Sequence, residues 1–314
     1  MSLFKWNVNS LQTPRQLQPR EMPSFDEVIA VHPISSSSGL TTFSAHLSTN
    51  WTIGNAPLGG YLVAIVLNAL KTHNVSVTGD KHKDCFHINV TFLNKPDAGR
   101  DVEITVKDVK RGRTYAVCSV EMWQEKRHIL TTLSTHSSFS AEKGPTYPQH
   151  SLAPFTLFKD CHPITTTLGP VKRPAIDNIE ICVDPAIEEL KRTERLQWIR
   201  LVNEPSRPID EPVVAMFADC LSVPPPYLHG QLGEGKVAWF PTLTLEIQFR
   251  APTSLDPQWI HIHYIAKMVK NGRFDIDVEV RDEKGEVLAL SRHLCTIVDA
   301  GKVGHAEGKV TAKI

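Results

Sequence analysis

Long apolar runs, paired cysteines and an excess of one charge are all missing from this sequence of 314 residues. The longest apolar stretch, Tyr61 to Leu70, has about half the length that a membrane-spanning helix needs, and the first twenty residues are too polar for a secretory signal. Lysine plus arginine and aspartate plus glutamate both number 34, so no overall field attracts nucleic acid or an anionic membrane. We therefore expect an intracellular protein that holds anionic ligands through local groups.

Several chemical signatures are missing as well. The six cysteines form no CxxC pair and have no histidines at zinc-ligand spacing, so they are interpreted as small core residues of a reducing compartment. No GxSxG elbow occurs, which disfavours a serine hydrolase of the α/β type, and no glycine-rich phosphate loop occurs either. The sequence therefore predicts no metal and no bound cofactor.

What the sequence does contain is a repeat. The stretch "NVTFLNKP" (Asn89 to Pro96) resembles "EIQFRAP" (Glu246 to Pro252), and each is an alternating strand that stops at a proline. Each is followed by the same order of strand, glycine-containing turn, strand, charged turn and strand. Phe92 corresponds to Phe249, and the "LSTH" that ends at His136 corresponds to the "LSRH" that ends at His293, at one common offset. Each half is therefore predicted to hold an antiparallel meander.

One helix is predicted before each meander. Leu58 to Thr72 is hydrophobic on nearly every face, so that helix must be enclosed by other elements. Ile209 to Leu221 starts with acidic residues and Pro212, and three prolines stop it. Between the halves, residues 141–174 are rich in proline, threonine and histidine, and Pro185 to Gln197 is interpreted as a short, exposed, charged helix.

These observations predict four segments. The first repeat covers residues 1–140, an irregular linker covers 141–176, the second repeat covers 177–300, and a flexible tail covers 301–314. The tail ends in Ala312-Lys313-Ile314. A small, a basic and an aliphatic residue resemble the Ser-Lys-Leu peroxisomal address, which an import receptor reads. Isoleucine replaces the usual leucine, so peroxisomal localisation is the hypothesis and the cytoplasm the alternative.

A helix sheathed by its own antiparallel sheet is the hotdog arrangement, and the repeat makes the expected fold a double hotdog of the α+β class. The segments "APLGGYLVAIVLNAL", "NVTFLNKP", "VVAMFADC", "PTLTLEIQFRAP" and "LALSRH" occur in this order. Together they resemble the acyl-CoA thioesterase II type of the thioesterase-like superfamily over roughly Phe43 to Val298.

The resemblance implies three catalytic positions. The family's acid, on the second helix, matches Asp219, and its threonine, at the start of the next strand, matches Thr242. Its third member is usually glutamine, but His293 stands there in this chain. Histidine can exchange a proton near neutral pH, whereas glutamine can only donate and accept hydrogen bonds. From the residues alone, Asp219 could also face solvent or cap a turn, Thr242 could be an ordinary strand residue, and His293 could simply be packed or solvated.

Gly59 and Gly60 stand at the start of the first helix. In a hotdog this end faces the cleft of the acyl thioester, so bare backbone amides there could stabilise an oxyanion. The alternative is close packing of the helix, which also selects glycine.

Four basic residues at the paired hairpin turns could take the phosphates of CoA, although exposed turn charges often serve solubility alone. They are Arg111, Arg113, Lys270 and Arg273.

The leading hypothesis is hydrolysis of a fatty or related acyl-CoA to free acid and CoA by an activated water, without a covalent intermediate. The alternatives are a hydratase or cyclase of secondary metabolism on the same fold, and a non-catalytic binder of acyl groups or small molecules. The expected partner is the acyl-CoA substrate, with no nucleic acid. The oligomeric state is left open, a homo-oligomer included.

Overall fold

The computed structural model describes residues 23–147, 157–163, 173–183, 194–202, 204, 206–221, 238–252 and 259–299. The predicted tail with Ala312-Lys313-Ile314 lies outside these residues, as do residues 148–156 and 164–172 of the predicted linker. None of the helices in the described ranges is long and apolar enough to cross a membrane.

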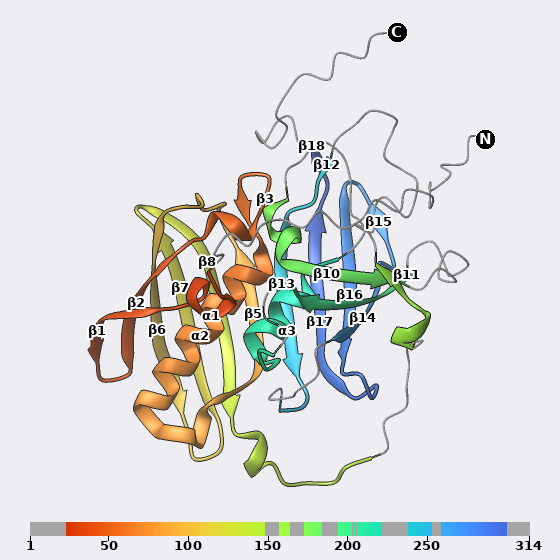
Figure 1. Cartoon of the computed structure of the whole chain (residues 1–314). Helices are drawn as coiled ribbons and strands as arrows, with labels where there is room; N and C mark the ends of the chain where they lie inside the picture. Colours follow the sequence, from red (N-terminus) through yellow and green to blue (C-terminus); the bar gives the residue numbers. More distant parts are fainter. Residues whose placement is uncertain are drawn as a thin grey trace, which may run out of the picture.

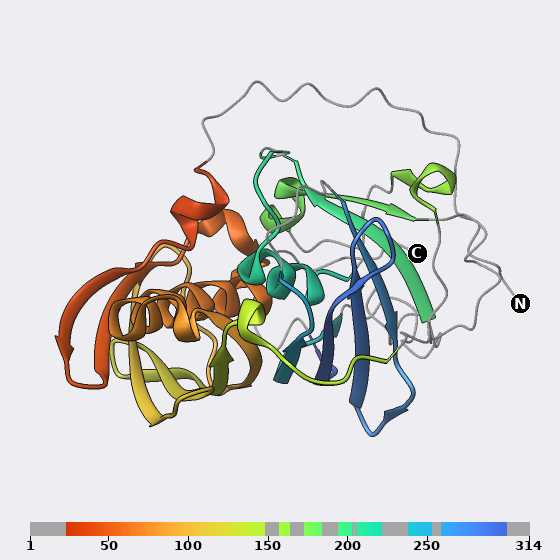
Figure 2. The same ribbon diagram turned by 90° about the horizontal axis from the view of Figure 1, so that it is seen from below.

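The first half is built around one long helix, α2 (Gly59–Thr78), which begins one residue later and ends six residues later than the sequence predicts. From Gly60 to Leu67 every residue of the helix is buried. Figures 1 and 2 show it lying against the strands of this half, as a helix with apolar side chains all round requires. These strands are β1 (His32–Ser37), β2 (Leu40–His46), β5 (Asp84–Phe92), β6 (Asp101–Arg111), β7 (Ala116–Gln124) and β8 (Arg127–Ser137).

The second half repeats this plan with a shorter helix, α3 (Glu211–Ala218), whose residues are all buried. The Asp210 side chain caps its first turn by accepting a hydrogen bond from Val213 N–H, and Pro212 lies within that turn. The hairpin between β15 and β16 turns on Asn271 and Gly272, both with positive φ, as predicted. The strands of this half are β9 (His162–Pro163), β10 (Ile179–Val183), β11 (Glu194–Leu201), β13 (Thr242–Phe249), β14 (Ile260–Ile265), β15 (Val269–Lys270), β16 (Arg273–Arg281) and β17 (Val287–Thr296).

One predicted helix is wrong over the residues that the structure describes. Residues 194–197 of the expected charged helix belong to strand β11, while 184–193 lie outside the described residues. Leu196, Trp198 and Ile199 are buried, and the Glu194 carboxylate is satisfied by His263 Nε2 at 2.7 Å. The charged residues therefore did not indicate a solvent-exposed helix, because His263 in the neighbouring strand pairs with the buried Glu194 carboxylate.

Among the described residues, fourteen strands form one antiparallel sheet in which β5 of the first half pairs with β13 of the second. Figure 1 shows the two sets of strands side by side, from red to yellow and from green to blue. Asn89 lies directly opposite Glu246, its own equivalent in the repeat. Irregular register also recurs at equivalent places, around Phe86 in β5 and around Leu243 in β13. A two-fold pseudo-symmetry axis therefore passes through the Asn89 and Glu246 pair, and the predicted double hotdog is confirmed.

Short elements complete the described fold. Before the first sheet stands α1 (Phe25–Val28), with a capping box formed by Ser24 and Glu27. Two small sheets pair β3 (Thr52–Ile53) with β4 (Ala56–Pro57), and β12 (Ala238–Trp239) with β18 (Val298–Asp299). The β3 and β4 pair leads directly into the first turn of α2 and so fixes where that helix begins.

Candidate active site

Asp219 lies where helix α3 ends. Its own backbone N–H donates back to the carbonyl oxygens of Met216 and Phe217, which closes the helix and turns the side chain towards the first half. The side chain is only 11% exposed. The exposed-face alternative for this residue is therefore excluded, and its carboxylate needs a partner inside the protein.

Gly60 of the first half supplies that partner. Its backbone N–H, in the first turn of α2, donates to Asp219 Oδ2 at 2.7 Å. A Cβ atom on Gly60 would come within 2.9 Å of Met216 Cα, and one on Gly59 would come within 2.8 Å of Asp219 Oδ2. Gly60 is therefore required by the close approach of the Met216 backbone, whereas the atoms that crowd Gly59 belong to side chains. The positive end of the α2 dipole faces the carboxylate.

The two predicted amide donors consequently differ in what they can do. Gly60 N–H is committed to Asp219, whereas Gly59 N–H donates to no residue within the described part of the chain. Of these two amides, only Gly59 N–H could therefore donate a hydrogen bond to a substrate oxygen without competition from the Asp219 carboxylate.

Burial raises the pKa of Asp219 to about 6, and the hydrogen bond from Gly60 opposes this rise only in part. The carboxylate is thus ionised at neutral pH and is more basic than an ordinary aspartate. A buried carboxylate tuned in this way is typical of a general base.

His293, on β17, stands beside the carboxylate. Its Nδ1 atom lies 3.6 Å from Asp219 Oδ1, which is too long for a direct hydrogen bond. Its Nε2 atom lies 3.1 Å from Ser291 Oγ, and that hydroxyl donates to the Glu246 carbonyl oxygen at 2.7 Å. Since the Ser291 proton is already used, Nε2 carries the imidazole proton and Nδ1 is a bare acceptor.

Burial lowers the pKa of His293 to about 4, so the ring is neutral at physiological pH. Two acceptors, Asp219 Oδ1 and His293 Nδ1, therefore face one another across 3.6 Å. One water molecule can donate one hydrogen to each of them, which would leave its oxygen lone pairs free for attack on an electrophile. The third family position, with histidine in place of glutamine, therefore still offers an acceptor.

Thr242 lies one step further away. It is the first residue of β13, and its Oγ1 atom is 3.6 Å from Cys295 Sγ. Burial raises the pKa of the Cys295 thiol to about 12, and the Asp219 carboxylate adds to this rise. Thr242 thus contacts Cys295, whose thiol is influenced by the charge of Asp219. In the described part of the chain, Thr242 makes no direct contact with Asp219 or His293.

Sequence reasoning did not single out two further residues of this site. The ring of Phe92, at the end of β5, comes within 3.3 Å of where a Gly59 Cβ would stand. Ser291 fixes the His293 tautomer, and its signal was present in the repeated Leu-Ser-x-His motif. Ser134 and His136 make the same contact in the first half, at 2.9 Å.

The structure separates the four basic turn residues. Arg111 points into the first half, where its Nε donates to Asp108 Oδ2 at 2.8 Å and its Nη2 donates to Asn74 Oδ1 at 3.0 Å. Burial alone would raise the pKa of Asp108, but hydrogen bonds from Arg111 and His73 hold it at about 2. The Arg111 guanidinium is therefore already paired within the first half.

Arg113, Lys270 and Arg273 are exposed at their turns. Arg273 lies opposite Thr296, the neighbour of Cys295, so it shares an end of the sheet with Thr242. Lys270 lies opposite Arg273 in the β15 and β16 hairpin, so these two basic residues share that end of the sheet.

One group of metal-ligand side chains occurs in the described residues. Atoms of His73, Asp108 and Cys118 all lie within 4.8 Å of one another. Arg111 donates to both carboxylate oxygens of Asp108, so a positive charge already occupies this cluster. The cluster is thus an internal ion pair with its hydrogen-bond partners.

Comparison with known families places this geometry in context. The model of the acyl-CoA thioesterase N-terminal domain matches residues 47–139, and the model of the acyl-CoA thioesterase C-terminal domain matches residues 158–297. Together they cover well over half of the chain. This chain belongs to the acyl-CoA thioesterase family. Membership supports thioesterase activity in general and does not define the acyl group.

Individual relatives of this acyl-CoA thioesterase family member are distant. The thioesterase-like protein TwmA of Talaromyces wortmannii is 24% identical, over 87% of this chain and 93% of its own length. A hotdog-fold protein of unknown function from Alicyclobacillus acidocaldarius superposes with a TM-score of 0.71 at 18% identity, over 88% of this chain and 98% of that one. A proposed thioesterase II of Thermobifida fusca superposes with a TM-score of 0.68 at 21% identity, over 88% of this chain and 98% of that one. The solved structures support the fold.

Proposed function

We propose that this protein hydrolyses the thioester of an acyl-CoA to the free acid and CoA. The observation that carries the proposal is the cross-half contact of Asp219. A buried carboxylate with a raised pKa is held by Gly60 N–H and faces a bare imidazole nitrogen of His293. Family membership supplies the thioester as the substrate class.

The chemistry follows from what each group can donate or accept. A water donates its hydrogens to Asp219 Oδ1 and His293 Nδ1, and its oxygen attacks the thioester carbonyl carbon while Asp219 takes the proton. The carbonyl oxygen gains the negative charge, and Gly59 N–H at the positive end of α2 is the donor proposed to stabilise it. When the intermediate collapses, the carbon–sulfur bond breaks and the CoA thiolate takes the proton back from Asp219.

Phosphate binding by Arg273 and Lys270 would place the CoA moiety at the rim of the same end of the sheet. Thr242 would act through Cys295 and the local backbone, or by contact with the substrate itself. Both roles are parts of the proposal and are separable from the hydrolytic step.

The test is a panel of acyl-CoAs, from short to long, in which thiol release is followed with wild-type protein and with Asp219→Asn. Hydrolysis of at least one ester, lost in the variant, is the expected result. Asp101→Asn is the matched control, because that carboxylate is largely exposed and pairs with His46, which is also largely exposed. Absence of thiol release from every ester would exclude the proposal and leave a non-catalytic acyl binder.

A further inference from the structure

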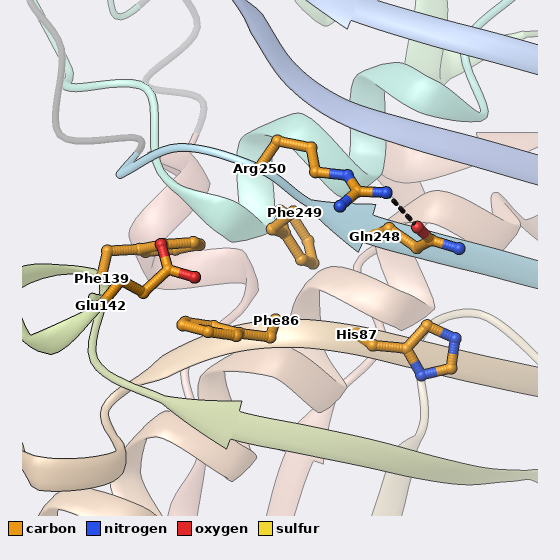
Figure 3. A pocket seen from close by; sticks show the side chains of 7 residues that line it. All are labelled: Phe86, His87, Phe139, Glu142, Gln248, Phe249 and Arg250. Carbon is orange, nitrogen blue, oxygen red and sulfur yellow. Dashed lines mark hydrogen bonds between the residues drawn. The ribbon is translucent and has the colours of Figure 1, made fainter. Parts of the chain in front are cut away.

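A hollow opens at the end of the β5 and β13 strand pair that lies away from Thr242 and Phe92. Its volume is about 340 Å³, and it lies between the ends of β5 and β13 (Figure 3). Phe86, Phe139 and Phe249 form its apolar walls, and the rings of Phe86 and Phe139 stack at 4.6 Å between centroids. Arg250 and Glu142 stand at its rim (Figure 3). Its volume is at the lower end of the range of small-molecule sites, and its lining combines three aromatic rings with polar side chains.

This hollow is the duplicate of the candidate active site. Rotation about the pseudo-two-fold axis through Asn89 and Glu246 exchanges β5 with β13, and so exchanges Phe92 with Phe249. Phe92 is the ring beside Gly59 in the candidate active site, and Phe249 is a wall of the hollow. The irregular register around Phe86 and around Leu243 obeys the same rotation.

The helices show how the duplicate differs in chemistry. Aligning Val63-Ala64 of α2 with Val214-Ala215 of α3 places Asn68 opposite Asp219 and Glu211 opposite Gly60. The Asn68 side chain donates to the Ile29 carbonyl oxygen at 2.8 Å, and an amide cannot accept a proton as Asp219 can.

Glu211 places a buried side chain where the active copy has a bare amide, and it is only 8% exposed. Its charge helps to raise the pKa of the Cys85 thiol, and Cys85 is the chain neighbour of Phe86, which lines the hollow. The duplicate therefore has an amide, Asn68, at the place of the Asp219 carboxylate, and it has the Glu211 side chain at the place of the bare Gly60 amide.

We propose that this hollow, lined by Phe86, Phe139 and Phe249, binds the acyl chain of a second ligand without hydrolysing it. The ligand carries an anionic head, either the carboxylate of a free acid or the phosphates of an acyl-CoA. The exposed guanidinium of Arg250 meets that head, held by its hydrogen bond to Gln248 Oε1 at 2.6 Å. Glu142 also lines the hollow, and its carboxylate would repel an anionic head, so the aromatic walls supply most of the affinity. The choice of an acyl ligand rests on the proposed function.

Binding stoichiometry tests the inference on the full-length protein. A thioether analogue of an acyl-CoA, which cannot be hydrolysed, and the matching free acid are each titrated by calorimetry. We expect two equivalents to bind for at least one of these ligands. The ligand that fills the second site identifies the head group as carboxylate or CoA.

Two variants test whether the second equivalent of ligand binds in the hollow. Phe139→Ala and Arg250→Ala are each expected to weaken it about tenfold or more, since one lost charge-assisted hydrogen bond or apolar wall is sufficient for this. Hydrolysis at the first site should be retained. Phe158→Ala and Arg100→Ala are matched controls with partly exposed side chains that do not line the hollow, and they should keep both equivalents.

Binding of a single equivalent of both ligands, or a second equivalent unchanged in Phe139→Ala and Arg250→Ala, would overturn the inference. The readout needs no turnover, so it distinguishes the two proposals. If no ester is hydrolysed but two equivalents bind, only the proposed function fails.

Discussion

Gly60 N–H donates to Asp219 Oδ2 at 2.7 Å although the two residues are 159 positions apart in the chain. The contact joins the first turn of α2 to the end of α3. It means that neither half carries the candidate site alone, and that the carboxylate is oriented by backbone rather than by a mobile side chain.

Replacing Asp219 with asparagine should abolish activity and stabilise the fold. Loss of a general base typically lowers kcat by about 10²–10⁴-fold. Because the pKa of Asp219 is raised to about 6, the folded state binds more protons than the unfolded state between about pH 4 and 6, so its contribution to stability falls as pH rises. At pH 7 the free energy of unfolding of the variant should exceed that of wild type by up to about 3 kcal/mol, since a shift of one pKa unit corresponds to about 1.4 kcal/mol. Urea unfolding at pH 4 and pH 7 measures this. An equal effect at both pH values would contradict the assignment.

The pH dependence of hydrolysis should follow Asp219. As pH falls through about 6 the carboxylate becomes protonated, so kcat/KM should decline about tenfold per pH unit below that value. His293 stays neutral down to about pH 4 and should add no second limb above it. A profile from pH 4.5 to 8 tests this, and constant kcat/KM down to pH 5 would exclude Asp219 as the base.

His293→Gln should be tolerated better than His293→Ala. If the ring acts as an acceptor for water through Nδ1, a glutamine amide oxygen can replace it, and kcat should stay within about tenfold of wild type. Alanine removes the acceptor and opens a cavity, so kcat should fall about a hundredfold or more. Thiol-release kinetics on both variants decide the matter. Equal losses would indicate that the imidazole itself transfers a proton.

The two glycines should respond differently to alanine. A Cβ on Gly60 would meet the Met216 backbone, which cannot move aside, so Gly60→Ala should lower the free energy of unfolding by about 1–3 kcal/mol. A Cβ on Gly59 would meet Asp219 Oδ2 and the Phe92 ring, which are side-chain atoms that can shift. Gly59→Ala should therefore reduce kcat more than stability. Paired urea melts and kinetics test the contrast, which would fail if both variants lost stability equally.

Glu211→Gln should remove a pH dependence of stability. Burial raises the pKa of Glu211 to about 7, so the folded state loses stability as pH rises from about 4.5 to 7. At pH 8 the glutamine variant should be more stable by up to about 3 kcal/mol, and at pH 4 it should match wild type. Urea midpoints at the two pH values provide the measurement, with Glu125→Gln as an exposed control. A variant no more stable than wild type at pH 8 would contradict the raised pKa.

The enclosed helix and the meanders could be predicted because their signals are local and strong. Leu58 to Thr72 has no polar face to expose, so a sheet must cover it. The charged stretch before Trp198 was wrongly predicted to be an exposed helix. A charged residue indicates solvent exposure only if no partner is buried with it, and the partner of Glu194 is His263, which comes from a strand far along the chain.

Arg111 shows a second limit of sequence reasoning. In a regular strand, residues three positions apart point to opposite faces, so Asp108 and Arg111 should not meet. The register shifts between Asp108 and Lys110, which brings both side chains to one face and allows their ion pair. No residue type in the sequence marks that irregularity.

The sequence alone determined that the chain is a duplicated sheet-and-helix protein with a carboxylate and bare glycines near two helix ends, since periodicity and repeats depend on neighbours in the chain. The tertiary structure decided which of these groups meet. Gly60 contacts Asp219, Ser291 leaves His293 Nδ1 as an acceptor, and Asn68, the counterpart of Asp219, donates to the Ile29 carbonyl oxygen instead. Such contacts are set by the packing of α2 against α3 and by the register of β13 with its neighbours, which join residues distant in the sequence.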